Sequence, residues 1–118
     1  MHQLDSIQTG DRIKVSGGYD FEPEWLDGSE SVTGVVVAFM PGQNDRPAAV
    51  IKLETRIRFG DVMGDILVLE LRYVGADWSP TGIVHVELCD FMPDPIPWRD
   101  RRKGKWAESH ASYERLPA

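Results

Sequence analysis

The chain has 118 residues, of which 42% are hydrophobic and 27% are charged. This length and composition are typical of one folded domain with a single hydrophobic core, and they exclude wholesale disorder. A formal net charge of −6 disfavours nonspecific binding of the whole chain to nucleic acid or to an anionic membrane. The single cysteine, Cys89, excludes an intramolecular disulfide, and the N-terminal sequence lacks the features of a secretion signal. No stretch is long and apolar enough to span a bilayer, so we expect a cytoplasmic protein.

Charge is distributed unevenly along the chain. Residues 1–97 contain 7 Lys and Arg against 16 Asp and Glu, a net charge of −9, whereas residues 98–118 contain 6 against 3, a net charge of +3. We therefore expect the two parts to attract each other or to attract different partners.

The first predicted strand spans residues 12–15, with Ile13 and Val15 on its apolar face. The segment 17–28, GGYDFEPEWLDG, follows it and combines aromatic with acidic side chains. Such a loop favours recognition of a cationic protein or peptide, because aromatic rings offer contact area and acids select positive charge. The alternative is that the aromatic rings cap an open end of the fold while the acids stay solvated. The candidate partner-binding residues here are Tyr19, Asp20, Glu22, Glu24 and Trp25.

Four further strands are predicted from period-two alternation of side chains, in which successive residues point to opposite faces. Residues 35–40 are apolar on both faces, as expected for a strand that is covered on each side. Residues 49–59 alternate apolar with mostly charged side chains, and residues 66–74 set leucines against Glu70 and Arg72. Residues 83–91 complete the set, and short links between these strands predict antiparallel neighbours.

One face of the last predicted strand carries His85, Glu87 and Cys89 at alternate positions. Alternate strand positions can supply two ligands to one metal ion. No second group of ligands is visible in the sequence, and the other histidines, His2 and His110, lie near the ends of the chain. The preferred interpretation is therefore a mixed-polarity outer strand face with no metal and no cofactor.

The remaining residues, 93–118, are predicted to form a tail outside a barrel domain of residues 1–92. Alternating prolines in MPDPIPW favour an extended path, and the basic run 99–105 follows. The spacing of Trp106, His110 and Tyr113 predicts a short C-terminal helix. The tail could pack on the acidic loop of its own chain or of a second copy, or it could bind nucleic acid. Its candidate partner-binding residues are Trp98, Arg99, Arg101 and Arg102.

The segments Gly10–Val15 and Gly34–Val37, with a long acidic loop between them, resemble the SH3-like small β-barrel superfamily. The resemblance implies an all-β fold, an SH3-like barrel or a compact roll of about five antiparallel strands. The chain lacks the paired tyrosines and the double tryptophan of peptide-binding SH3 domains, so the resemblance implies a fold and no ligand class.

These features predict a non-catalytic binding module that contacts a protein through the acidic aromatic loop and the basic tail. One alternative is an inhibitor or immunity-type protein that neutralises a cationic partner. A nucleic-acid-binding protein that uses the tail and a small metal-dependent enzyme are the others. No nucleophile motif, phosphate-binding glycine loop or helical zinc motif occurs in the sequence, so no catalytic residue is assigned.

Overall fold

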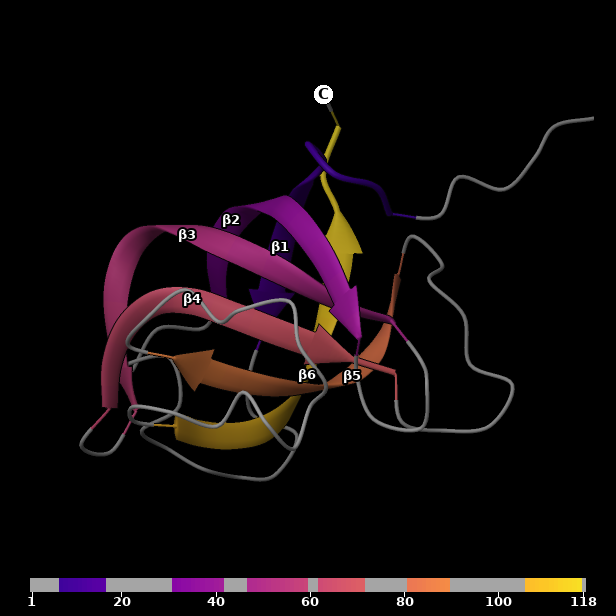
Figure 1. Cartoon of the computed structure of the whole chain (residues 1–118). Coiled ribbons are helices and arrows are strands. Elements are labelled where there is room, and N and C mark those ends of the chain that lie inside the picture. Colours follow the sequence, from indigo (N-terminus) through magenta and orange to yellow (C-terminus); the bar gives the residue numbers. More distant parts are fainter. Residues whose placement is uncertain are drawn as a thin grey trace, which may run out of the picture.

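The structure is a computed structural model that describes residues 7–16, 31–41, 47–59, 62–71, 81–89 and 106–117. Six strands in these residues form a closed antiparallel barrel (Figure 1). Strands that follow each other in sequence are neighbours in the barrel, and β6 pairs with β1 to close it. The predicted all-β class and the antiparallel barrel are thus confirmed. The strands are β1 (Arg12–Ser16), β2 (Ser31–Pro41), β3 (Pro47–Phe59), β4 (Val62–Glu70), β5 (Thr81–Cys89) and β6 (Trp106–Arg115).

Alternate residues of each strand fill the barrel interior, because successive side chains of a strand point to opposite faces. Among the described residues of the predicted strands, the side chains buried in the interior have the predicted parity, namely Ala49, Ile51, Leu53, Ile57, Leu67, Leu69, Leu71, Val84, Val86 and Leu88. Thr55, predicted for the same face of β3, is exposed, and it lies within an irregularity of the β3–β4 register. The interior is a single apolar cluster with little or no solvent exposure. Its strand members include Ile13, Val15, Val36, Ala49, Ile51, Leu53, Leu67, Leu69, Val84, Val86, Leu88, Ala111 and Tyr113.

Strand β2 departs from the prediction of a strand covered on both faces. The pairing of β2 with β3 shifts register between Val36 and Ala38, which leaves Val37 as an extra residue in a bulge. Val36 is buried in the barrel interior, whereas Val37 is 39% exposed. Beyond the bulge, Phe39 packs against the interior cluster and Met40 belongs to a different cluster. The bulge therefore changes which residues of β2 face inward.

Strand β6 corrects the predicted C-terminal helix. Residues Trp106–Arg115 pair with β5 on one side and with β1 on the other, so this part of the chain closes the barrel (Figure 1). Ala111 and Tyr113, two residues apart, are both buried in the interior. The helix prediction is wrong because pairing on both sides satisfies the backbone of this segment in an extended conformation. The barrel consequently has six strands instead of about five.

Gly34 marks a close approach of β2 to β3. A Cβ atom at this position would lie 2.5 Å from the carbonyl oxygen of Lys52 and 2.7 Å from Cγ2 of Ile51. Both distances are too short for any side chain larger than hydrogen, so β2 can pack against β3 here only with glycine.

Candidate functional site

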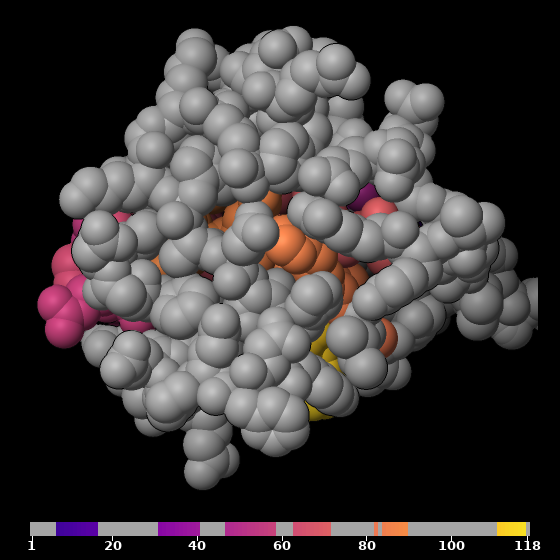
Figure 2. Space-filling model, turned by 90° about the horizontal axis from the view of Figure 1, so that it is seen from below, coloured from indigo at the N-terminus to yellow at the C-terminus, as the bar shows by residue number. Residues whose placement is uncertain are grey.

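The outer faces of β2, β3, β4 and β5 carry a second buried cluster, separate from the barrel interior. It consists of apolar and weakly polar side chains, namely Met40, Ala48, Val50, Ile66, Val68 and Cys89. Three ionisable side chains share this face: Glu70 on β4, and His85 and Glu87 on β5. Figure 2 views the molecule from below, with atoms of β5 (orange) near the middle of the picture and atoms of β6 (yellow) beside them. The outer face of β5 thus carries two buried ionisable side chains, His85 and Glu87.

The strand register brings the three ionisable side chains together. His85 and Glu87 are two residues apart on β5 and so point to the same face, and Glu70 is the direct cross-strand partner of His85. Their relative exposures are 1% for Glu70, 5% for His85 and 0% for Glu87. One potential ligand atom from each of the three residues lies within 4.8 Å of the others. We call these three residues the buried triad.

One contact in the buried triad joins the imidazole to a carboxylate. Nε2 of His85 lies 3.7 Å from Oε2 of Glu87. Burial of each carboxylate away from water costs several kcal/mol unless positive charge or hydrogen bonds compensate for the lost solvation. The compensating charge can come from a protonated imidazole or from a bound cation.

The register between β5 and β6 adds two residues of the same chemical types at neighbouring positions. His110 is the register partner of His85, and Glu108 is the register partner of Glu87. Glu70, His85 and His110 thus occupy one row of paired backbone positions across β4, β5 and β6. The described relationship between these positions is one of backbone register.

The sequence placed His85, Glu87 and Cys89 on one outer strand face, and the structure confirms that placement. The face is buried, however, and its third ionisable member is Glu70. Cys89 packs in the apolar cluster and is not part of the buried triad. Alternation already placed Glu70 opposite the leucines of its strand, but only the register of β4 against β5 reveals that it pairs with His85.

The predicted partner-binding residues lie outside the residues that the structure describes. They are Tyr19, Asp20, Glu22, Glu24, Trp25, Trp98, Arg99, Arg101 and Arg102. The structure does describe the strand ends from which their two segments start. Ser16 at the end of β1 pairs with Ser31 at the start of β2, and Cys89 at the end of β5 pairs with Trp106 at the start of β6.

Barrel topology relates these two connections to each other. All neighbouring strands are antiparallel, so successive connections alternate between the two ends of the barrel. The β1–β2, β3–β4 and β5–β6 connections therefore leave from the same end. The acidic segment and the basic segment are anchored at that shared end.

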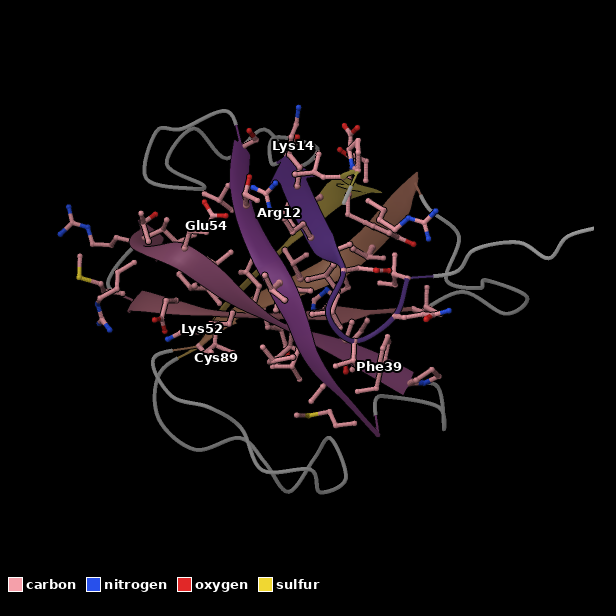
Figure 3. The ribbon with its side chains drawn as sticks, turned by 90° about the horizontal axis from the view of Figure 1, so that it is seen from above. Arg12, Lys14, Phe39, Lys52, Glu54 and Cys89 are labelled. Carbon is pink, nitrogen blue, oxygen red and sulfur yellow. The ribbon has the colours of Figure 1, made fainter. Side chains whose placement is uncertain are left out.

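The side wall of the barrel around β1 to β4 carries exposed ion pairs. Arg12 Nη2 lies 3.3 Å from Glu54 Oε2, and the two side chains point toward each other in Figure 3. Lys14 lies near Glu114 and Lys52 contacts Asp65. Arg12 and Glu54 are each about half exposed, so solvent screens their attraction and the pair contributes little to stability. These exposed ion pairs differ from the buried triad, whose side chains are almost fully shielded from solvent.

Comparisons with protein-family models, with curated proteins and with solved structures find no match. The part of the chain that the structure describes contains no helix of the length and hydropathy that a membrane span requires.

Proposed function

We propose that this chain is a non-catalytic binding module on an SH3-like barrel, and that it contacts a cationic protein or peptide through the acidic aromatic loop. The residues proposed to make the contact are Tyr19, Asp20, Glu22, Glu24 and Trp25. Trp98, Arg99, Arg101 and Arg102 form the second proposed surface, which either competes for the loop or contacts the same partner.

The observation that carries this proposal is the shared barrel end of the two segments. The connection that contains the acidic loop begins after Ser16, and the connection that contains the basic run 99–105 begins after Cys89, at the ends of strands β1 and β5 that run in the same direction. Segments of opposite charge that are anchored at one end of a small rigid barrel are favourably placed to form one composite surface.

The negative charge of the acidic loop favours a cationic ligand. Residues 17–28 contain four acidic side chains and no basic one, whereas residues 99–105 contain five basic side chains and one acid. A cationic, proline-containing peptide matches the loop in charge, and an extended proline-rich conformation loses little entropy on binding. The chain's own residues 93–105 have this composition, so they are the reference ligand for a test.

The test is a titration of the full chain with a synthetic peptide of residues 93–105. Fluorescence anisotropy measures the binding at low salt and at physiological salt. The wild-type chain and the variant R99Q/R101Q/R102Q are both measured, because the chain's own basic segment competes with the peptide. We expect the triple variant to bind the peptide several-fold more tightly than the wild type.

A double variant, E22Q/E24Q, is expected to lose at least tenfold in affinity for the peptide in the triple-variant background. Glu54→Gln is the matched control, because Glu54 is an exposed acid on the side wall of the barrel. Absence of peptide binding to both the wild type and R99Q/R101Q/R102Q, or equal losses in E22Q/E24Q and E54Q, overturns the proposal.

A further inference from the structure

We propose that Glu70, His85 and Glu87 form a binding site for one divalent transition-metal ion, Zn²⁺ in the first instance, on the outer wall of the barrel. The site is separate from the acidic loop, and it depends only on residues of β4 and β5 that the structure describes.

The ligand types define the class of ion. Two carboxylates and one imidazole are an oxygen and nitrogen donor set, which suits borderline ions such as Zn²⁺, Fe²⁺ and Mn²⁺. An imidazole disfavours Mg²⁺ and Ca²⁺, which prefer oxygen ligands alone. The thiol of Cys89 is not within this group of ligand atoms, so a thiolate site is not proposed.

The geometry is close to that of a metal site that is ready to be occupied. Two ligand atoms about 2.1 Å from a tetrahedral Zn²⁺ are separated by about 3.4 Å. Nε2 of His85 and Oε2 of Glu87 are already 3.7 Å apart, and one ligand atom from each of the three residues lies within 4.8 Å of the others. Changes of side-chain rotamer in Glu70 and Glu87 can close the remaining difference without movement of the strands.

Low polarity next to the triad favours its attraction to a divalent ion. A metal ion binds the deprotonated carboxylate and the neutral imidazole, so binding releases any protons that these groups hold. Ala48 and Val68 of the apolar cluster are the register partners of Glu70 and Glu87, and an apolar neighbourhood reduces the screening of the attraction by water.

The backbone register places His110 and Glu108 of β6 opposite His85 and Glu87 of β5. Three protein ligands leave one position of a tetrahedral Zn²⁺ for a water molecule or a further ligand.

The experiment is isothermal titration of ZnCl₂ into the full chain after EDTA treatment and desalting. Titrations with MnCl₂ and MgCl₂ run in parallel, together with thermal melts. We expect one Zn²⁺ per chain, a higher melting temperature with Zn²⁺, and at least tenfold weaker binding of Mg²⁺.

Glu70→Gln and Glu87→Gln keep the side-chain volume, and each is expected to weaken Zn²⁺ binding by at least tenfold. His2→Gln and Glu54→Gln are controls for binding elsewhere, and both are expected to bind Zn²⁺ as the wild type does.

A readout on the wild type keeps the test valid if a triad variant fails to fold. The ring nitrogen resonances of His85 in ¹⁵N-histidine-labelled protein are expected to shift on addition of one equivalent of Zn²⁺. Unchanged His85 resonances, no saturable Zn²⁺ binding by the wild type, or equal Zn²⁺ affinity of a folded Glu87→Gln variant would each overturn the proposal. These outcomes are independent of the peptide titration, so each proposal stands or fails separately.

Discussion

Glu70 of β4 and His85 of β5 are directly paired across an antiparallel ladder on the outer wall of the barrel, and their relative exposures are only 1% and 5%. Glu87, two residues beyond His85, is fully buried on the same face. The pair is surrounded by an apolar cluster, where charged groups interact strongly and are costly when they lose a partner.

Loss of the imidazole alone should destabilise the metal-free protein. His85→Ala removes the buried imidazole whose Nε2 lies 3.7 Å from Oε2 of Glu87, and we expect a loss of about 3–5 kcal/mol in the free energy of unfolding. Replacement of the whole triad by apolar side chains, E70M/H85L/E87M, removes the buried charge and should restore most of that loss. Urea denaturation in the presence of EDTA measures both. Glu54→Gln on the exposed wall should change stability by no more than about 0.5 kcal/mol, and a His85→Ala loss as small as that would contradict the account.

Substitution of Gly34 and of Gly10 by alanine should destabilise the protein for different reasons. Gly34→Ala places a Cβ atom 2.5 Å from a backbone oxygen of β3, so the strands must separate, and we expect a loss of several kcal/mol. Gly10 has a φ of +97° but open space around its Cα, so Gly10→Ala costs only the backbone term, about 1–2 kcal/mol. Thermal melts of the two variants rank these costs, and a Gly10→Ala loss equal to or larger than that of Gly34→Ala would refute the close approach of β2 to β3.

Removal of β6 should prevent the barrel from folding. A chain that ends at Lys105 loses the ladders to both β5 and β1 and the buried residues Ala111 and Tyr113. We expect no cooperative unfolding transition by circular dichroism and aggregation on gel filtration. A chain that ends at Leu116 keeps the hydrogen bond that the Leu116 amide donates to the carbonyl oxygen of Arg12, and should fold normally. A cooperative transition for the shorter chain would mean that β6 is dispensable. For this reason point variants of residues 93–105, and not deletions, are the appropriate test of the basic segment.

Core and surface side chains of the same strand should differ sharply in their contribution. Leu69 is fully buried in the barrel interior, and Leu69→Ala is expected to cost about 2–5 kcal/mol. Met63 on β4 is 45% exposed, and Met63→Ala should cost less than about 1 kcal/mol. Chemical denaturation compares the two, and similar losses would indicate a different inward parity for β4.

The strands β3, β4 and β5 were predictable from sequence because each alternates apolar and polar side chains over many residues. The register between them was not, since alternation states which face a residue occupies but not which residue lies beside it. The sequence therefore does not predict that Glu70 pairs with His85, although both residues lie on predicted strands. The same pattern of residues that identified the outer face could not show that this face is buried.

Strand β6 shows how two periodicities can compete within one short segment. The spacing of Trp106, His110 and Tyr113 matches a helix, whereas Ala111 and Tyr113 match one face of a strand. A segment of ten residues with small and polar side chains has little intrinsic preference for strand, and pairing with β1 and β5 decides its conformation. With the segment assigned to a helix, His110 could not be related to His85.

Closure of the barrel has a consequence for how the chain reaches its native state. Five of the ladders join strands that are adjacent in sequence, but the sixth pairs Ile13 with Arg115. The ladder between β1 and β6 closes the largest loop in the fold. It forms only when the first and the last strand are both in position. Until β6 is in place between them, β1 and β5 each present an unpaired edge that the β6 strand of another molecule can fill. Refolding at high concentration should therefore favour strand exchange between molecules, whereas dilution should favour closure within one chain.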